Sequence, residues 1–340
     1  QENSMTQRKP MKFTLLMIIL AGALSCQSQT TKTMKENQNN PLLCDPITGT
    51  CELPDAGTQD SSQFIMLNQK KPVKIIYYTD PICSSCWGIE PQLRKLKLEY
   101  GEYIKIDYRM GGLLPDWSYN SGGISKPSDV AHHWEEVSAY YEMPIDGGVW
   151  LEDPLPSSYP PSIAVKAAQM QDKEKAIVFM RKLREYVFLE KKNITKWEVI
   201  SAAAKAVGLN VEQLKKDYES GDAKKLFEED LAFGRQLGVR GFPSMYFSGS
   251  DDKRFLVYGF KPYEAFEDAI KQIAPEAKKK AIDTSTPLAL FAHYPTLTAK
   301  EYSVLYSISV KEAQKTLEAL VSENKLSKLV IKTGTLYQKK

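Results

Sequence analysis

The chain has 340 residues, a formal net charge of +3 and 42% hydrophobic residues. This length allows two or three domains, each with a sizeable core. The nearly balanced charge excludes any strong indication of a nucleic-acid or acidic partner.

A short apolar segment near the N-terminus predicts export. Basic residues precede the run 13–24, which has the length of a signal-peptide core and is short for a membrane span. The segment resembles a bacterial lipoprotein signal in which Cys26 becomes the lipidated first residue, although Ala23 replaces the usual leucine. We therefore expect residues 1–25 to be a signal peptide and the mature protein to be a membrane-anchored lipoprotein facing the periplasm or cell exterior. A plain secretion signal cut near Ser25 and a short anchor are the alternatives.

Two close cysteine pairs remain if Cys26 is lipidated, and such pairs in an exported protein indicate disulfides or dithiols. Residues 26–70 are predicted as a polar tether that contains a loop from Cys44 to Cys51, where Asp-Pro and Thr-Gly turns allow the two thiols to meet. We expect a structural Cys44–Cys51 disulfide. A second redox pair that exchanges electrons with Cys83 and Cys86, and a zinc site built from all four thiols, are the alternatives.

The stretch 74–91 contains the motif around which we expect the rest of the chain to be organised. Residues 73–78 predict a strand, Asp80-Pro81 breaks it, and a Cys83-Ser84-Ser85-Cys86 turn leads into a helix with one apolar face. Pro91 is expected to kink this helix.

The position of Cys83 at the start of that helix predicts chemistry. Backbone N–H groups and the helix dipole stabilise a thiolate there. Cys86 lies one turn later and is expected to be less exposed. Cys83 is therefore the predicted nucleophile, Cys86 the resolving thiol, and Cys83–Cys86 the redox-active disulfide.

The rest of the central region alternates between strands and helices. Residues 103–108 predict a second strand, and 109–117 a loop near the active-site turn. From 128 to 237 the pattern is mostly helical. Strands are expected again around Pro243 and over 254–258, followed by helices and turns that include a closing helix over 262–273.

Two motifs, DPICSSCWGIEP at 80–91 and GVRGFPSMYF at 238–247, resemble the thioredoxin superfamily, in particular its DsbA-like branch. The resemblance covers roughly 71–274. It implies an α/β thioredoxin fold in two halves, with an inserted helical domain between them; the expected boundaries are 71–125, 126–236 and 237–276. It also implies a cis Phe242–Pro243 bond that faces the cysteines, and a backbone at Phe242 that pairs with an extended substrate.

A small C-terminal unit is predicted over 284–340, after a lysine-rich linker. Two capping boxes, Thr298 with Glu301 and Ser309 with Glu312, begin helices, and a hairpin follows near the end. The unit resembles a winged-helix fold. Because export argues against DNA binding, we expect a role in packing or protein contact.

The resemblance implies a thiol–disulfide oxidoreductase that acts on exported protein thiols. An oxidising compartment favours an oxidase or isomerase, and a reductant stays open. Partners would be thiol- or disulfide-containing proteins, a redox partner and the membrane, with no nucleic acid, cofactor or metal. Ser84-Ser85 replaces the histidine of strongly oxidising members, so we expect a less depressed Cys83 pKa and a more reducing couple. Asp80 assists proton transfer to Cys86 or serves as a turn residue. Trp87 and Phe242 are candidates for substrate binding within an aromatic groove, although a row of aromatic residues also fits a core; the whole set is Tyr77, Tyr78, Trp87, Trp117 and Phe242.

The alternative function is a non-catalytic adaptor on the same fold. The pattern Asp-Pro-x-Cys-x-x-Cys-Trp also resembles a subgroup that contains bacterial adaptor proteins for protease-directed turnover. There the C-terminal unit and the Cys44/Cys51 pair would serve partner contact. A glutathione-dependent isomerase or transferase is disfavoured, because such enzymes rely on a single serine or cysteine. His132 and His133 are expected to be ordinary helix residues.

Overall fold

The structure, a computed structural model, describes residues 44–45, 49–52, 71–118, 125–250 and 253–340. The predicted signal peptide and Cys26 lie outside these residues. Among the helices that the structure describes, none is long and apolar enough to cross a bilayer.

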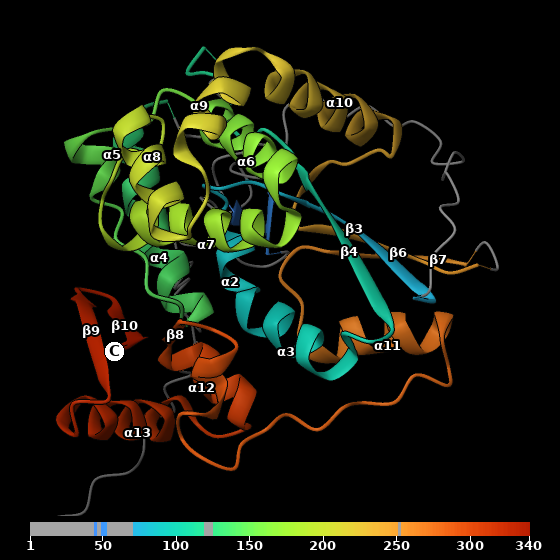
Figure 1. Ribbon diagram of the computed structural model, residues 1–340, viewed down its shortest axis with the longest axis vertical. Helices are drawn as coiled ribbons and strands as arrows, with labels where there is room; N and C mark the ends of the chain where they lie inside the picture. Colours follow the sequence, from blue (N-terminus) through green and yellow to red (C-terminus); the bar gives the residue numbers. More distant parts are fainter. Residues whose placement is uncertain (1–43, 46–48, 53–70, 119–124, 251–252) are drawn as a thin grey trace, which may run out of the picture. The chain divides into compact units, whose positions relative to one another are not determined.

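A four-stranded mixed sheet forms the centre of the fold (Figure 1), in the order β4-β3-β6-β7. Strand β3 (Val73–Thr79) pairs parallel with β4 (Ile104–Met110) and antiparallel with β6 (Ser244–Ser248), which pairs with β7 (Arg254–Tyr258). The predicted strands are confirmed. One boundary was wrong: Arg109 and Met110, expected in a loop, extend β4, because their backbone continues the ladder with Tyr78 and Thr79.

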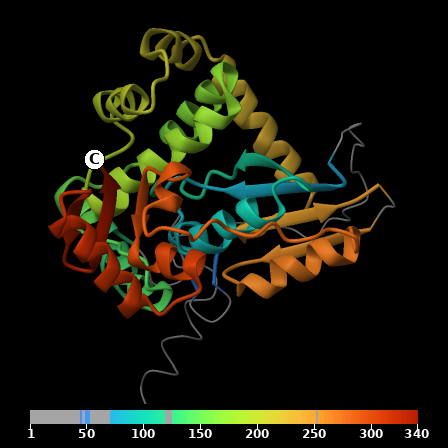
Figure 2. The same ribbon diagram turned by 60° about the horizontal axis from the view of Figure 1, so that its bottom comes forward.

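Helices cover both faces of the sheet, as Figures 1 and 2 show. On one face, α3 (Glu90–Tyr100) lies beside α11 (Tyr263–Ile273), and the Tyr100 hydroxyl donates to Glu267 at 2.6 Å. On the other face, α10 (Asp222–Gln236) packs against β4, and the Tyr78 hydroxyl donates to the Asp230 carbonyl at 2.8 Å. Helices thus lie against both faces of the sheet whose strand β3 leads into the CxxC turn.

The predicted helical stretch lies between β4 and β5 (Gly241–Phe242), as the DsbA-like resemblance implied. Sequence signals set its helix ends: the Asp172 side chain accepts two backbone N–H groups to begin α7, and Gly208 adopts a left-handed φ of 71° after α8. The exact domain boundaries stay a prediction. The helices of this stretch are α4 (Pro127–Tyr141), α5 (Val149–Glu152), α6 (Tyr159–Gln171), α7 (Lys173–Leu189), α8 (Trp197–Ala206), α9 (Val211–Glu219) and α10.

The C-terminal elements have a buried apolar cluster of their own, which includes Leu297, Tyr302, Leu317 and Tyr337. Both predicted capping boxes are present, and β8, β10 and β9 form a three-stranded sheet in that order. The winged-helix assignment stays a prediction. The elements are a 3₁₀ helix (Ala289–Ala292), β8 (Thr296–Thr298), α12 (Ala299–Tyr306), α13 (Val310–Ser322), β9 (Leu326–Ile331) and β10 (Gly334–Lys339).

A buried ion network connects the C-terminal unit to the rest of the fold. The Glu301 carboxylate of α12 forms salt bridges with the guanidinium groups of Arg181 in α7 and Arg94 in α3. The N–O distances are 2.7 Å and 3.2 Å, respectively. Arg184 of α7 contacts Glu90 of α3 at 2.6 Å. Three arginines thus face three carboxylates, since Glu185 also accepts from Arg181 at 3.0 Å. This balance offsets the cost of removing the charges from water.

The network continues to the end of β3. The Arg184 guanidinium donates to the Thr79 hydroxyl at 2.5 Å and to the Asp80 carbonyl at 3.2 Å. Burial by itself would raise the pKa of Glu90, but Arg184 and Arg181 hold that pKa below its ordinary value. Glu90 therefore stays ionised, and one continuous set of ion pairs and hydrogen bonds links the CxxC turn to α12.

Replacing Glu301 with glutamine should destabilise the protein by about 3–5 kcal/mol, because Arg94 and Arg181 then lose their shared buried carboxylate. Glutamine can still cap α12 at this position, so the loss reports the ion pairs. Urea unfolding measures it. Glu323→Gln is the control, since its pair with Lys325 is half exposed and should contribute less than about 1 kcal/mol. Equal effects of both substitutions would contradict the assignment.

Candidate thiol–disulfide site

Cys83 lies at the N-terminus of a short helix, α2 (Ser84–Gly88), as predicted. Its Sγ accepts the backbone N–H of Cys86 at 3.1 Å, and the two residues form a disulfide with a Cα–Cα distance of 5.2 Å. Helix α2 ends at Gly88, Ile89 caps both helices, and α3 begins at Glu90 immediately before Pro91, so the expected kink is a break between two helices. The sequence of this turn thus places one sulfur where N–H groups stabilise negative charge.

Both sulfur-bearing residues are buried. We expected Cys83 to be the more exposed of the two, yet both have 0% relative exposure. That expectation was wrong for this state of the chain, because neighbouring segments cover the start of α2; strand β2 (Thr50–Glu52) is among the elements that contact it. An external thiol can therefore reach this disulfide only after the segments that cover the start of α2 move away.

Asp80 is a fully buried carboxylate beneath the turn. It accepts the backbone N–H of Ile82 at 3.0 Å, the N–H of Leu113 at 2.8 Å and the Ser158 hydroxyl at 2.9 Å. Burial raises the pKa of Asp80 to about 6, and these three hydrogen bonds oppose the rise. The group therefore titrates near neutral pH, as a proton-transfer residue requires. Its transfer to Cys86 stays a prediction.

The Phe242–Pro243 peptide bond is cis, as the resemblance implied. The Phe242 ring packs on Gly111, where an added Cβ would lie 1.8 Å from the ring. The backbone of Phe242 already pairs with Cys51 of β2 in an antiparallel ladder. The edge expected to receive an extended substrate is thus occupied by the N-terminal part of the same chain.

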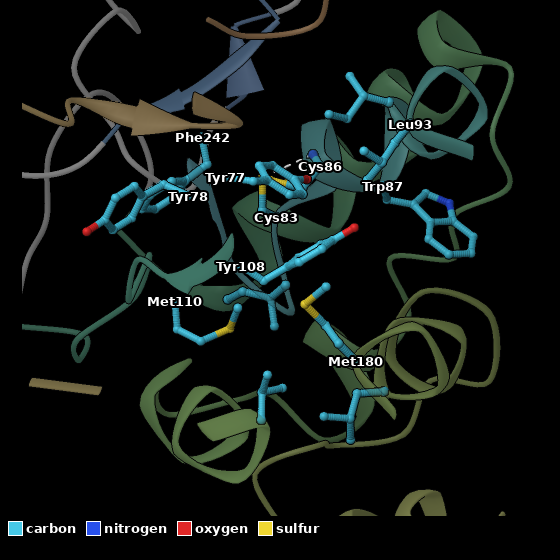
Figure 3. Close-up of a cluster of buried hydrophobic side chains, with 14 of the residues drawn as sticks. Tyr77, Tyr78, Cys83, Cys86, Trp87, Leu93, Tyr108, Met110, Met180 and Phe242 are labelled. Carbon is cyan, nitrogen blue, oxygen red and sulfur yellow. Dashed lines mark hydrogen bonds between the residues drawn. A yellow bond between two sulfur atoms is a disulfide. The ribbon is translucent and has the colours of Figure 1, made fainter. Parts of the chain in front are cut away.

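Four of the five aromatic residues around the site belong to the core, as the alternative to a groove predicted, and Figure 3 shows them in one cluster of buried side chains. Tyr77, Tyr78, Trp87 and Phe242 are all within 1% of complete burial. Trp87 donates its ring N–H to the Pro144 carbonyl at 3.0 Å and lies under the Arg181 guanidinium. Trp117 is half-buried, and its ring N–H donates to the Leu155 carbonyl at 2.8 Å. The predicted substrate-binding roles of Trp87 and Phe242 stay predictions, but neither side chain is accessible here.

Three residues around the site were not predicted. Arg184 and Ser158 contact the ends of the CxxC turn as described above, and Tyr141 shares a hydrogen bond of 2.7 Å with Ser85 inside the motif. Arg184 and Tyr141 lie in ordinary amphipathic helices, so no local signal distinguishes them. Ser158 directly precedes α6, in a polar stretch with no local sign of a contact with Asp80.

The second cysteine pair is described by its backbone. Cys44 in β1 (Cys44–Asp45) and Cys51 in β2 are direct partners across an antiparallel hairpin. The side chains of both residues lie outside the part that the structure describes. The Cys44–Cys51 disulfide and the four-thiol zinc site therefore stay predictions.

Taken together, a CxxC disulfide at a helix start, a cis-proline directly before β6 and the four-stranded sheet β4-β3-β6-β7 define a thioredoxin-like protein with a DsbA-like helical insertion. A family model described as Thioredoxin matches residues 77–268. The chain belongs to this family.

Relatives and a solved structure extend the comparison. The chain is 33% identical over 311 residues to the ClpXP adapter protein SpxH of Halalkalibacterium halodurans, covering 89% of this chain and 98% of that protein. It is 30% identical over 274 residues to the SpxH of Bacillus subtilis, covering 79% and 90%. A Nitrosomonas europaea structure described as a candidate protein disulfide isomerase aligns with a TM-score of 0.53 and 21% identity, covering 61% of this chain and 99% of that one.

The stability of the wild type relative to Asp80→Asn should fall as pH rises from about 4 to about 6. The folded-state pKa of about 6 lies above the ordinary 3.8, so the folded protein binds the proton more tightly and loses that advantage as the group ionises. The difference should reach about 3 kcal/mol, since one pKa unit corresponds to about 1.4 kcal/mol. Urea unfolding at several pH values measures it. Parallel pH profiles for the two proteins would show that Asp80 has an ordinary pKa.

Proposed function

We propose that this protein is a protein-binding adaptor built on a thioredoxin fold. The observation that carries the proposal is the extent of the match to relatives named as ClpXP adapters, which covers 98% of one of them. The disulfide-isomerase-like structure covers 61% of this chain. The adaptor relatives thus share more than the thioredoxin part.

The geometry supports an adaptor in two ways. Cys83 and Cys86 have no exposed surface in this state, so their disulfide does not meet an external substrate directly, as a catalytic disulfide would have to. The C-terminal unit is fixed to α3 and α7 through Glu301, Arg94 and Arg181, so it forms a rigid extension of the thioredoxin part. A rigid, additional surface is what an adaptor needs in order to hold a second protein.

A thiol–disulfide oxidoreductase is the second candidate. The observations in its favour are the placement of Cys83, whose sulfur accepts the backbone N–H of Cys86 at the start of α2, and the cis Phe242–Pro243 bond that the family resemblance implied. Asp80 supplies a buried carboxyl group with a pKa of about 6. In this case the chain would exchange disulfides with thiol-bearing proteins, with Cys83 attacking and Cys86 resolving.

Cellular location separates the two candidates. The segment before Cys26 predicts an exported lipoprotein, and export favours the oxidoreductase acting on exported thiols. Retention of an uncleaved N-terminus in the cytoplasm favours the protease adaptor. Export stays a prediction from the sequence and counts against the protease adaptor, so fractionation with mass spectrometry of the N-terminal peptide decides between the two candidates.

The adaptor proposal predicts that the purified protein binds ClpX of the same organism with a Kd in the micromolar range or tighter. The expected result for Cys83→Ser is an unchanged Kd, because the thiol takes no part in binding. Surface plasmon resonance measures the binding, and insulin reduction with dithiothreitol is assayed alongside. If ClpX is not bound and insulin reduction depends on Cys83, the oxidoreductase replaces the adaptor as the function.

A further inference from the structure

The N-terminal hairpin occupies the strand edge beside the cis-proline. In β2, Cys51 pairs with Phe242 and Glu52 pairs with Gly241, and Phe242 is the residue immediately before Pro243. An extended polypeptide that added a strand at this edge would occupy the same backbone positions. The chain therefore carries a segment of its own, with a cysteine in it, at the place where a partner strand would bind.

Gly49, immediately before β2, is connected to the CxxC motif through Phe260 and Tyr141. The Phe260 N–H donates to the Gly49 carbonyl at 2.6 Å. Gly49 has a φ of 64°, and an added Cβ would lie 2.2 Å from the Phe260 Cβ, so the approach requires glycine. The Phe260 ring packs 4.7 Å from the Tyr141 ring, whose hydroxyl bonds Ser85 between the two cysteines.

We propose that Cys51 is a resident exchange partner of Cys83, and that Cys44 and Cys51 form a second redox pair that passes electrons to and from Cys83–Cys86. The register carries the proposal: Cys51 faces the residue before the cis-proline, and Cys44 faces Cys51 on the next strand. This inference is independent of the adaptor function, because it concerns exchange within one chain.

The exchange is balanced without an external reagent. The Cys51 thiolate attacks the Cys83 sulfur, the Cys83–Cys86 bond breaks, and Cys86 leaves as a thiolate that takes up a proton. Cys44, deprotonated in turn, attacks the Cys51 sulfur, a Cys44–Cys51 bond forms, and Cys83 leaves. Two electrons and two protons have then moved from the hairpin pair to the CxxC pair, and the reverse steps return them.

The test traps the mixed disulfide in the full chain. All variants carry Cys26→Ser, which leaves the four cysteines of the two pairs as the starting point. In the Cys44→Ala/Cys86→Ala variant, Cys51 and Cys83 cannot be resolved, and oxidation with glutathione disulfide should link them. The matched control, Cys51→Ala/Cys86→Ala, offers Cys44 in place of Cys51. Peptide mapping should find the Cys51–Cys83 link at least about tenfold more often than the Cys44–Cys83 link, with a yield that dilution leaves unchanged.

A second measurement keeps all four thiols. The protein is partly reduced with a limiting amount of dithiothreitol, and free thiols are alkylated at successive times. The labelling of each cysteine then gives the rate at which electrons equilibrate between the two pairs. Gly49→Ala should slow this step severalfold, since the added methyl group separates the hairpin from Phe260. Gly208→Ala is the control, with a similar positive φ and open space around it. Equal trapping of Cys44 and Cys51, or equal equilibration rates in the two glycine variants, would overturn the proposal.

Discussion

The buried charges of α3, α7 and α12 are the constraint on which much of this structure depends. Each of these ions is costly to remove from water, so each must keep its partners. Glu301 needs arginines from two different helices, and Arg184 needs both Glu90 and the end of β3. The requirement fixes the C-terminal unit, the helical insertion and the CxxC turn in one arrangement, with a specificity that apolar packing alone would not provide.

The same requirement determines the character of the disulfide site. The Arg181 guanidinium lies over the Trp87 ring, and the Arg184 guanidinium donates a hydrogen bond to the Asp80 carbonyl. The network therefore contacts both helix α2 and the turn that precedes Cys83. A start of a helix stabilises a thiolate, whereas burial opposes any charge. The site therefore combines the elements of thiol chemistry with restricted access, and this combination is compatible with a protein that binds partners more than it turns them over.

The β1–β2 hairpin also restricts access to the strand edge before the cis-proline, and this restriction bears on both candidate functions. A strand edge next to a cis-proline is a place for polypeptide recognition. In this chain β2 takes that edge, so a partner strand competes with a segment that is always at high effective concentration. An adaptor would use this competition to select partners, and a redox protein would use it to protect its disulfide.

The sequence alone determined the sheet strands, the helical insertion, the CxxC helix start, the two C-terminal capping boxes and, through resemblance, the cis-proline. These features depend on local periodicity, on caps a few residues apart or on short motifs. Each can therefore be predicted from residues that are close together in the sequence. Tertiary structure alone decided the burial of Cys83, the core position of the aromatic residues, the roles of Arg184 and Tyr141, and the pairing of Cys51 with Phe242. Each of these depends on residues that are distant in sequence, and a side chain carries no local sign of the distant group that will cover it or share its charge.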